Sequence, residues 1–353
     1  MVLILIGTLA QVRMGTFAAQ RVYFNSWWLY SYVEDWKVPV FPGGLTVGVI
    51  WLVNLIASFI TRFRFSKEDL GIYVTHAGII LLLLGQGLTQ TLSRETQMPI
   101  EIGQSGNYSQ SSLKSELVFI DTSNPDYDEV TSIPESYFAH EGEIHAPHLP
   151  FTIVIRKFFR NARLGMATPD HQSLATRGIG PQVSVQEIPP VSSDEETNNL
   201  AAFVEIKDGS ESKGTYLVSS GLGAPQSVNV RGQNYEMHIR PKRSYFPFTL
   251  TLKEFHHDIY PGTDIPRNFS SLVQIINPQT HESRTALIYM NHPLRYGRRT
   301  FYQASFGEGD KLSVFQVMEN PVSMTPYISC AMVAAGLLIQ FLGHLFEFMR
   351  KRT

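Results

Sequence analysis

The chain has 353 residues, a formal net charge of −2 and a sequence pI near 6.6, which gives no reason to expect a nucleic-acid partner. Its single cysteine, Cys330, excludes an intrachain disulfide, a CxxC zinc pair and a CxxCH haem-attachment motif. Any metal or haem must therefore be held by side chains such as histidine, methionine, tyrosine or carboxylates. The mean hydropathy of −0.06 averages over two very apolar ends and a polar middle.

Three apolar stretches, residues 42–60, 70–92 and 326–349, are long enough to cross a membrane. At a rise of about 1.5 Å per residue, each covers the roughly 30 Å of a hydrocarbon layer. Backbone groups in lipid must be satisfied within the segment, so we expect α-helices. A fourth apolar segment, residues 1–10, covers only about half of such a span. We interpret it as the second half of a helix whose first half is absent; a cleaved signal peptide is the alternative.

Basic residues in short loops predict the orientation of the spans. Arg62, Arg64 and Lys67 separate the two middle spans, and residues 350–352 follow the last one. Both groups are predicted to be cytoplasmic. The prediction is a multi-pass protein of the inner (cytoplasmic) membrane. Residues 1–92 form an N-terminal transmembrane region, residues 93–322 a large extracytoplasmic domain on the periplasmic side, and residues 323–353 a last helix with a cytoplasmic tail.

The outside domain is predicted to be rich in β-strands. Residues 248–252 alternate between apolar and polar side chains, as a half-buried strand does. Residues 151–155, 271–276 and 312–317 are short and rich in β-branched side chains. Residues 201–206 and 215–218 flank Asp208-Gly209, which is typical of a hairpin with an extended loop. The predicted fold class is an α-helical transmembrane bundle, with three full spans and a partial first one, carrying a large antiparallel β-sandwich or open barrel.

Two histidines lie inside the predicted spans. An ionisable side chain within a membrane helix is a functional-site candidate by default. His76 lies six residues from the start of its span, and His344 lies six residues before Arg350, so both are expected about 9 Å from the cytoplasmic face. They are candidates to contact one haem or to line one entry route. The alternatives are a neutral His76 hydrogen-bonded to a neighbouring helix, and an interfacial His344 paired with Glu347.

Other patterns have a structural interpretation beside a functional one. Gly71, Gly78 and Gly85 are spaced by seven and share one helix face, which favours close helix packing over a haem-binding surface. Trp27 and Trp28, with nearby tyrosines, are typical of an interfacial aromatic belt, with haem stacking as the alternative. Three further groups are predicted to be structural or solvated rather than ligands. They are the outside histidines 140, 145, 148, 256 and 257, the arginines 295, 298 and 299, and Cys330.

Several motifs, in one order, resemble the ResB (CcsB) family. The matching segments are residues 6–11 (IGTLAQ), 258–271 (DIYPGTDIPRNFSS), 289–296 (YMNHPLRY), 300–306 (TFYQASF), 314–321 (VFQVMENP) and 326–330 (PYISC). The resemblance covers both ends of the chain and their architecture, and residues 95–236 match only loosely.

The resemblance implies a membrane subunit of c-type cytochrome maturation. Members of this family work with a CcsA/ResC-type membrane protein to bind haem, move it across the membrane and present it to apocytochrome c. By position, His76 carries the role of the family's third-span haem ligand, with haem b bound transiently and the opposite iron ligand supplied by the partner. His344 is the second cofactor-binding candidate. We expect an accessory, non-catalytic subunit of a haem-attachment (holocytochrome c synthase) complex, since no hydrolase or nucleotide-binding motif occurs in the chain.

Two other functions remain open at this point. One is a membrane-anchored scaffold that binds a protein or an envelope component and carries no haem. The other is a b-type haem subunit for electron transfer, which would hold haem tightly in the isolated chain. A visible spectrum of the purified protein, with and without its partner, separates the three.

Overall fold

A computed structural model describes residues 1–33, 36–62, 66, 69–168, 172–191, 198–262, 266–307, 309 and 311–352. The chain divides into two compact units. The helical unit comprises Met1–Glu95, Met290–Tyr302 and Val317–Thr353, and the β unit comprises Thr96–Tyr289 and Gln303–Gln316. Arg64 and Lys67, which were used to predict the orientation of the spans, lie outside the described residues.

The helical unit contains the predicted apolar helices. Three helices of the described chain are long and apolar enough to cross a membrane: α2 (Gly44–Arg62), α3 (Leu70–Leu92) and α5 (Thr325–Arg352). The N-terminal helix α1 (Val2–Ala19) is longer than the apolar segment predicted at residues 1–10, with a break in helical geometry at Gly15, and a short π-helical turn η1 (Gln20–Phe24) follows it.

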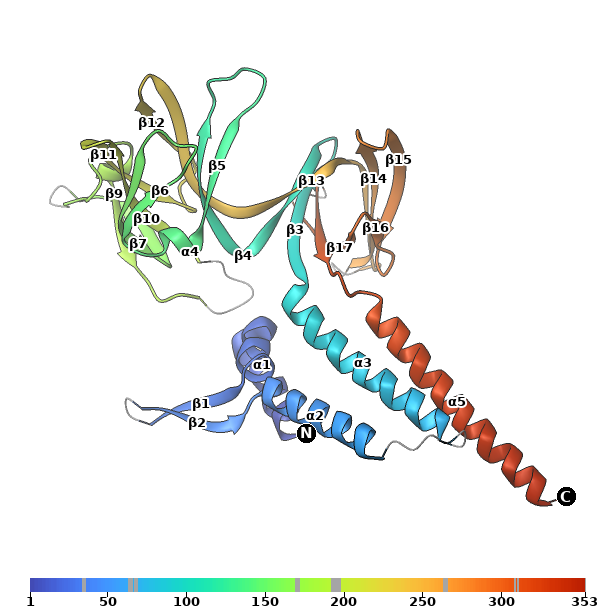
Figure 1. Ribbon diagram of the computed structural model, residues 1–353. Coiled ribbons are helices and arrows are strands. Elements are labelled where there is room, and N and C mark those ends of the chain that lie inside the picture. Colours follow the sequence, from blue (N-terminus) through green and yellow to red (C-terminus); the bar gives the residue numbers. More distant parts are fainter. Residues whose placement is uncertain are drawn as a thin grey trace. The chain divides into compact units, whose positions relative to one another are not determined.

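Two short hairpins complete this unit. Strands β1 (Trp28–Val33) and β2 (Trp36–Pro42) pair antiparallel between η1 and α2 (Figure 1). Strand β16 (Leu294–Tyr296) pairs antiparallel with the first residues of β17 (Arg299–Gly307).

The β unit is antiparallel, which confirms that part of the predicted fold class. One sheet has the order β11-β10-β7-β6, and the larger one contains β15-β14-β13-β4-β3-β18-β17, with β12 on β13 and β5 on β4. The first sheet and its companions are β6 (Gly142–His145), β7 (Thr152–Phe159), β10 (Ala201–Asp208), β11 (Glu211–Ser219), the β8 (Ala162–Met166) and β9 (Val183–Glu187) pair, and the short helices α4 (Glu135–Phe138) and η2 (Gly180–Gln182). The larger sheet has β3 (Arg94–Glu101), β4 (Ser105–Asp121), β5 (Glu129–Pro134), β12 (Gln226–Val230), β13 (Gln233–Ile259), β14 (Pro266–Asn277), β15 (Glu282–Tyr289) and β18 (Leu312–Glu319).

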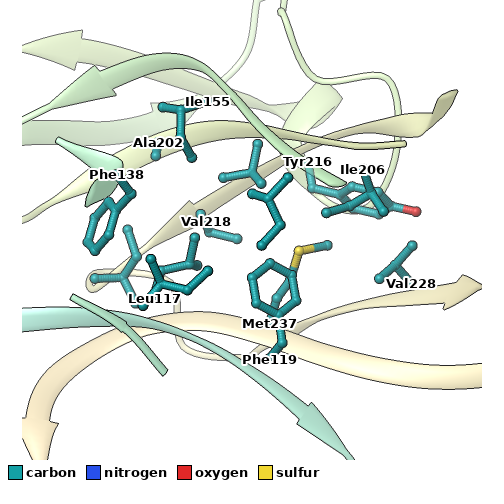
Figure 2. Close-up of a cluster of buried hydrophobic side chains, with 14 of the residues drawn as sticks. Leu117, Phe119, Phe138, Ile155, Ala202, Ile206, Tyr216, Val218, Val228 and Met237 are labelled. Carbon is teal, nitrogen blue, oxygen red and sulfur yellow. The ribbon is translucent and has the colours of Figure 1, made fainter. Parts of the chain in front are cut away.

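The main core lies between two β layers. In Figure 2, Leu117, Phe119 and Met237 from β4 and β13 face Ile155 of β7 and Val218 of β11. All five side chains are at most 1 % exposed. Alternating apolar residues on each strand supply this face, as period-two side-chain geometry requires. Burying a large side chain of this kind contributes about 1.5–3 kcal/mol, so the two layers form the stable centre of the unit.

Strands β4 and β13 are unusually long, and each contributes both to the core of Figure 2 and to the sheet beyond it. β13 has 27 residues and β4 has 17. Their pairing shifts at Pro241, where residues 111–114 of β4 have no partner on β13. Proline has no N–H to donate to a ladder, and extra residues on one strand bend it, so this point is a bulge. The first part of β13 then serves the core of Figure 2, and its second part pairs with β14.

Candidate functional site

The candidate site is built on α3, which packs along α5 (Figure 1). Gly71, Gly78 and Gly85 are the buried residues of α3. A Cβ atom on Gly71 would lie 2.6 Å from both the backbone nitrogen of Gln340 and the carbonyl oxygen of Gly336. A Cβ on Gly85 would lie 2.3 Å from Thr325 Cγ2. The two helices are therefore antiparallel and in close contact, and the glycine spacing is explained by helix packing.

His76 projects from a different face of α3. It follows Gly71 by five residues, which turns it by about 140° from the glycine face that contacts α5. Tyr73, one turn earlier, makes an edge-on ring contact with Phe59 of α2 at 6.0 Å between centroids. The imidazole is half-buried. The packing of α3 on α5 therefore leaves this ring outside the contact.

The hydrogen bond of His76 defines its tautomer. Nδ1 lies 2.8 Å from the carbonyl oxygen of Ile72, one turn earlier in the same helix. A carbonyl oxygen only accepts, so Nδ1 carries the proton and donates it. Nε2 is then unprotonated in the neutral ring and has its lone pair available. Histidine ligands in metal sites are commonly held in this way, by a backbone carbonyl on the other nitrogen.

His344 has a different environment. It is exposed on α5, and its Nε2 lies 2.9 Å from Nε2 of Gln340. The Gln340 amide therefore occupies His344 Nε2. Glu347, the expected partner of His344, instead accepts a hydrogen bond from Lys351 at 2.6 Å. Of the two histidines, His76 has the better arranged ring for an axial iron ligand.

The two histidines do not lie at the same level, contrary to the expectation of equal depth. Gly71 contacts Gln340, so these two residues mark one level on the antiparallel pair. His76 is five residues from that level in one direction and His344 four residues in the other, a separation of roughly 13 Å along the axes. Counting from the charged ends failed because α5 extends beyond the start of α3. Within this helix pair the two rings do not approach one iron.

The other predicted positions are either paired with a neighbouring side chain or exposed. Arg299 forms an ion pair with Glu319 at 3.4 Å, and Arg295 is within 3.5 Å of the Tyr327 hydroxyl. Arg298 and Cys330 are exposed. The exposed His256 contacts Glu254 at 3.1 Å. In the described part of the chain, no three His, Cys, Asp or Glu residues group into a metal site.

A buried charged cluster in the β unit was missed from the sequence. Arg240 Nε donates to Glu116 Oε1 at 2.8 Å, and Ser132 Oγ donates to Glu116 Oε2 at 2.6 Å. The side chains of Arg240 and Glu116 are only 8 % and 4 % exposed. Burial, together with the charges of Arg240 and Arg243, lowers the pKa of the nearby His238. The ion pair joins residues 124 positions apart, so no local sequence pattern predicts it.

Comparison with known proteins agrees with this architecture. The chain is 24% identical over 345 residues to Protein NrfI of Wolinella succinogenes, covering 97% of this chain. The chain spans about one third (33%) of the length of that relative. Residues 66–325 match the ResB-like family, and this segment is well over half of the chain and contains α3 and the whole β unit. The chain therefore belongs to the ResB-like family.

Proposed function

We propose that this chain is a membrane subunit of c-type cytochrome maturation that handles haem together with a CcsA/ResC-type partner. Membership of the ResB-like family and the similarity to Protein NrfI support the maturation role. The single observation that carries the haem assignment is the hydrogen bond from His76 Nδ1 to the Ile72 carbonyl, which leaves Nε2 available. His76 of this chain and a residue of the partner would together hold the iron of haem b.

A membrane location is supported by the exposed apolar surface of the helices. Helix α2 has no buried residue in its apolar window Gly44–Thr61, and α5 exposes many large side chains such as Leu338, Phe341 and Phe346. Soluble proteins rarely leave so much contiguous apolar surface in water. The basic residues next to the spans favour a cytoplasmic location for those ends, and this supports a periplasmic location for the β unit.

The residues of this chain would bind and orient haem rather than transform it. The Ile72 carbonyl would hold the His76 ring in one orientation, with Nε2 left to bind haem iron. Haem, when bound, would supply the iron that His76 holds and the vinyl groups that react with apocytochrome thiols. Attachment requires that these groups be aligned, so placement is the contribution expected of this chain. The β unit would dock the partner and the apocytochrome.

A visible spectrum tests whether His76 holds haem. The chain, co-purified with its partner, should show a Soret band that His76→Ala reduces by at least about tenfold, since one of two axial ligands is lost. Added imidazole should restore part of the band by filling the vacated position. His344→Ala is the matched control and should leave the band unchanged, because Nε2 of His344 is engaged by Gln340.

The contrary outcomes identify the other functions. A His76→Ala protein at normal abundance with an unaltered Soret band and normal cytochrome maturation would overturn the haem assignment. No Soret band in the wild-type pair would favour a scaffold without haem. A tight band in the isolated chain, with redox turnover by a quinone, would favour a b-type electron-transfer subunit.

A further inference from the structure

The hairpin β1–β2 has a composition that is unusual for a surface element. Across the six residues of β1 and the seven of β2, Ser31 and Lys37 are the only side chains that are neither apolar nor aromatic. Trp28 is 46 % exposed, Trp36 is 76 % exposed and Val40 is 59 % exposed. A two-stranded hairpin is at best marginally stable alone in water. This element therefore needs surroundings that accept apolar side chains.

Both faces of the hairpin share this character. The pairs Trp28–Pro42 and Tyr30–Pro39 lie on one face, and Lys37 Nζ lies 4.3 Å above the Tyr30 ring on the same side. The other face carries the pairs Leu29–Phe41 and Ser31–Val38, together with Trp36. An antiparallel hairpin with one face in water would carry polar side chains at every second position. Neither face of this hairpin is polar in that way.

The base of the hairpin is held against the first turn of α2. The carbonyl oxygen of Trp27 accepts hydrogen bonds from Gly43 N at 2.8 Å and from Thr46 Oγ1 at 2.5 Å. Gly43 is required there, because a Cβ atom would lie 2.1 Å from the Ser26 carbonyl oxygen. Since α2 is apolar from its first residues, the hairpin begins at the level where that helix would leave the hydrocarbon layer.

The composition of the hairpin fits lipid better than a protein surface. The chain has four tryptophans. Trp28 and Trp36 are in the hairpin, Trp27 directly precedes it, and Trp51 is in α2. Trp and Tyr, with an occasional Lys, are the side chains that concentrate at the membrane–water interface. The unpaired strand edges of a hairpin cannot be satisfied within hydrocarbon, so the depth must be that of the headgroups. At about 3.3 Å per residue the hairpin is roughly 23 Å long, and only a flat orientation brings Trp36 near its tip to that depth.

We propose that β1–β2 runs along the headgroup layer of the periplasmic leaflet with both faces immersed, and that it anchors the helical unit through Trp28 on one face and Trp36 on the other. The proposal rests on the membrane topology of the proposed function. It assigns to this segment a lipid surface as its partner.

Tryptophan fluorescence tests this directly, because the β unit contains no tryptophan. Two variants of the full chain are reconstituted in phosphatidylcholine vesicles. One retains only Trp36 (Trp27→Phe, Trp28→Phe and Trp51→Phe), and the other retains only Trp51. The acyl chains are brominated either near the carboxyl end or near the methyl end. Trp36 should lose more emission with the shallow bromines, whereas Trp51, about 10 Å along α2, should be quenched more by the deeper ones.

The pair of variants separates failure of the hairpin proposal from failure of the topology. Quenched Trp51 with unquenched Trp36 would overturn the lipid-bound hairpin and leave the spans intact. Quenching of neither residue would overturn both. A Trp36 that is unquenched alone but shifts to shorter emission wavelength with the co-reconstituted partner would show a protein interface and would also overturn the lipid proposal.

Discussion

Glu116 is the residue on which the charged cluster of the β unit depends. It accepts hydrogen bonds from Arg240 and Ser132 in an almost fully buried setting. Glu116→Ala would leave the Arg240 guanidinium buried without a counter-charge, which typically costs about 3–5 kcal/mol. We expect a loss of that size in the unfolding free energy, measured on the full chain in detergent from the β-sheet circular dichroism signal.

Two matched variants distinguish charge burial from ordinary packing. Ser132→Ala removes only one hydrogen bond to Glu116 and should cost about 1 kcal/mol. Replacing both ionic partners, Glu116→Leu with Arg240→Met, should recover much of the loss, because no charge is then left buried. A single Glu116→Ala variant as stable as wild type would contradict the interpretation.

His238 predicts a pH dependence of stability. Its Nδ1 is buried and finds no hydrogen-bond partner in the described part of the chain. Burial and the charges of Arg240 and Arg243 lower its pKa below the ordinary value of 6.5, against an opposing effect of Glu116. The unfolded chain therefore binds a proton more readily than the folded one. Stability should be complete above pH 6.5, fall as the pH drops below it, and stop falling from this cause once the folded-state pKa is passed.

The corresponding measurement is a series of denaturation midpoints across that range. His238→Gln should flatten the slope just below pH 6.5, since the titrating group is gone. His140→Gln, at an exposed position, is the control and should keep the wild-type slope. An unchanged slope in the His238 variant would show that another group is responsible.

The contact between helices α3 and α5 leaves no room for added atoms at Gly71. The Cβ of an alanine at Gly71 would meet backbone atoms of Gln340 and Gly336 at 2.6 Å, and backbone cannot swing aside as a side chain does. Gly71→Ala should therefore separate the helices and cost about 1–3 kcal/mol, seen as a lower Tm in detergent. Gly87→Ala is the control in the same helix, since nothing lies within 4 Å of its added Cβ. Equal Tm values for the two variants would refute close packing as the reason for the glycines.

Element boundaries were predicted well where a single stretch of sequence determines them. Apolar composition located α3 at residues 70–92, as observed, and α2 within two residues of Gly44–Arg62. The Asp208-Gly209 turn located the β10–β11 hairpin, but the expected extended loop is wrong, because the pairing continues to Asp208 and Glu211. The full length of β13 was not foreseen, because Pro241 and its charged neighbours interrupt the strand-like pattern that continues on both sides.

Across the molecule, most of what sequence could not predict depends on contacts between distant residues. The register of α3 against α5, which separates His76 from His344, follows from where Gly71 meets Gln340 and not from distance to the charged ends. The Glu116–Arg240 pair likewise exists only when β4 and β13 align. The position of His76 in an apolar helix was visible in the sequence, whereas its tautomer required the Ile72 contact.

The two long strands β4 and β13 have one more consequence. β4 and β13 pair with each other on both sides of the bulge at Pro241. The part of the β unit before the bulge and the part after it are therefore built from the same two strands. Neither region can be excised as a fragment without cutting through both strands. Melting that starts on one side removes partners from the other, and the β unit should lose its structure in a single cooperative event.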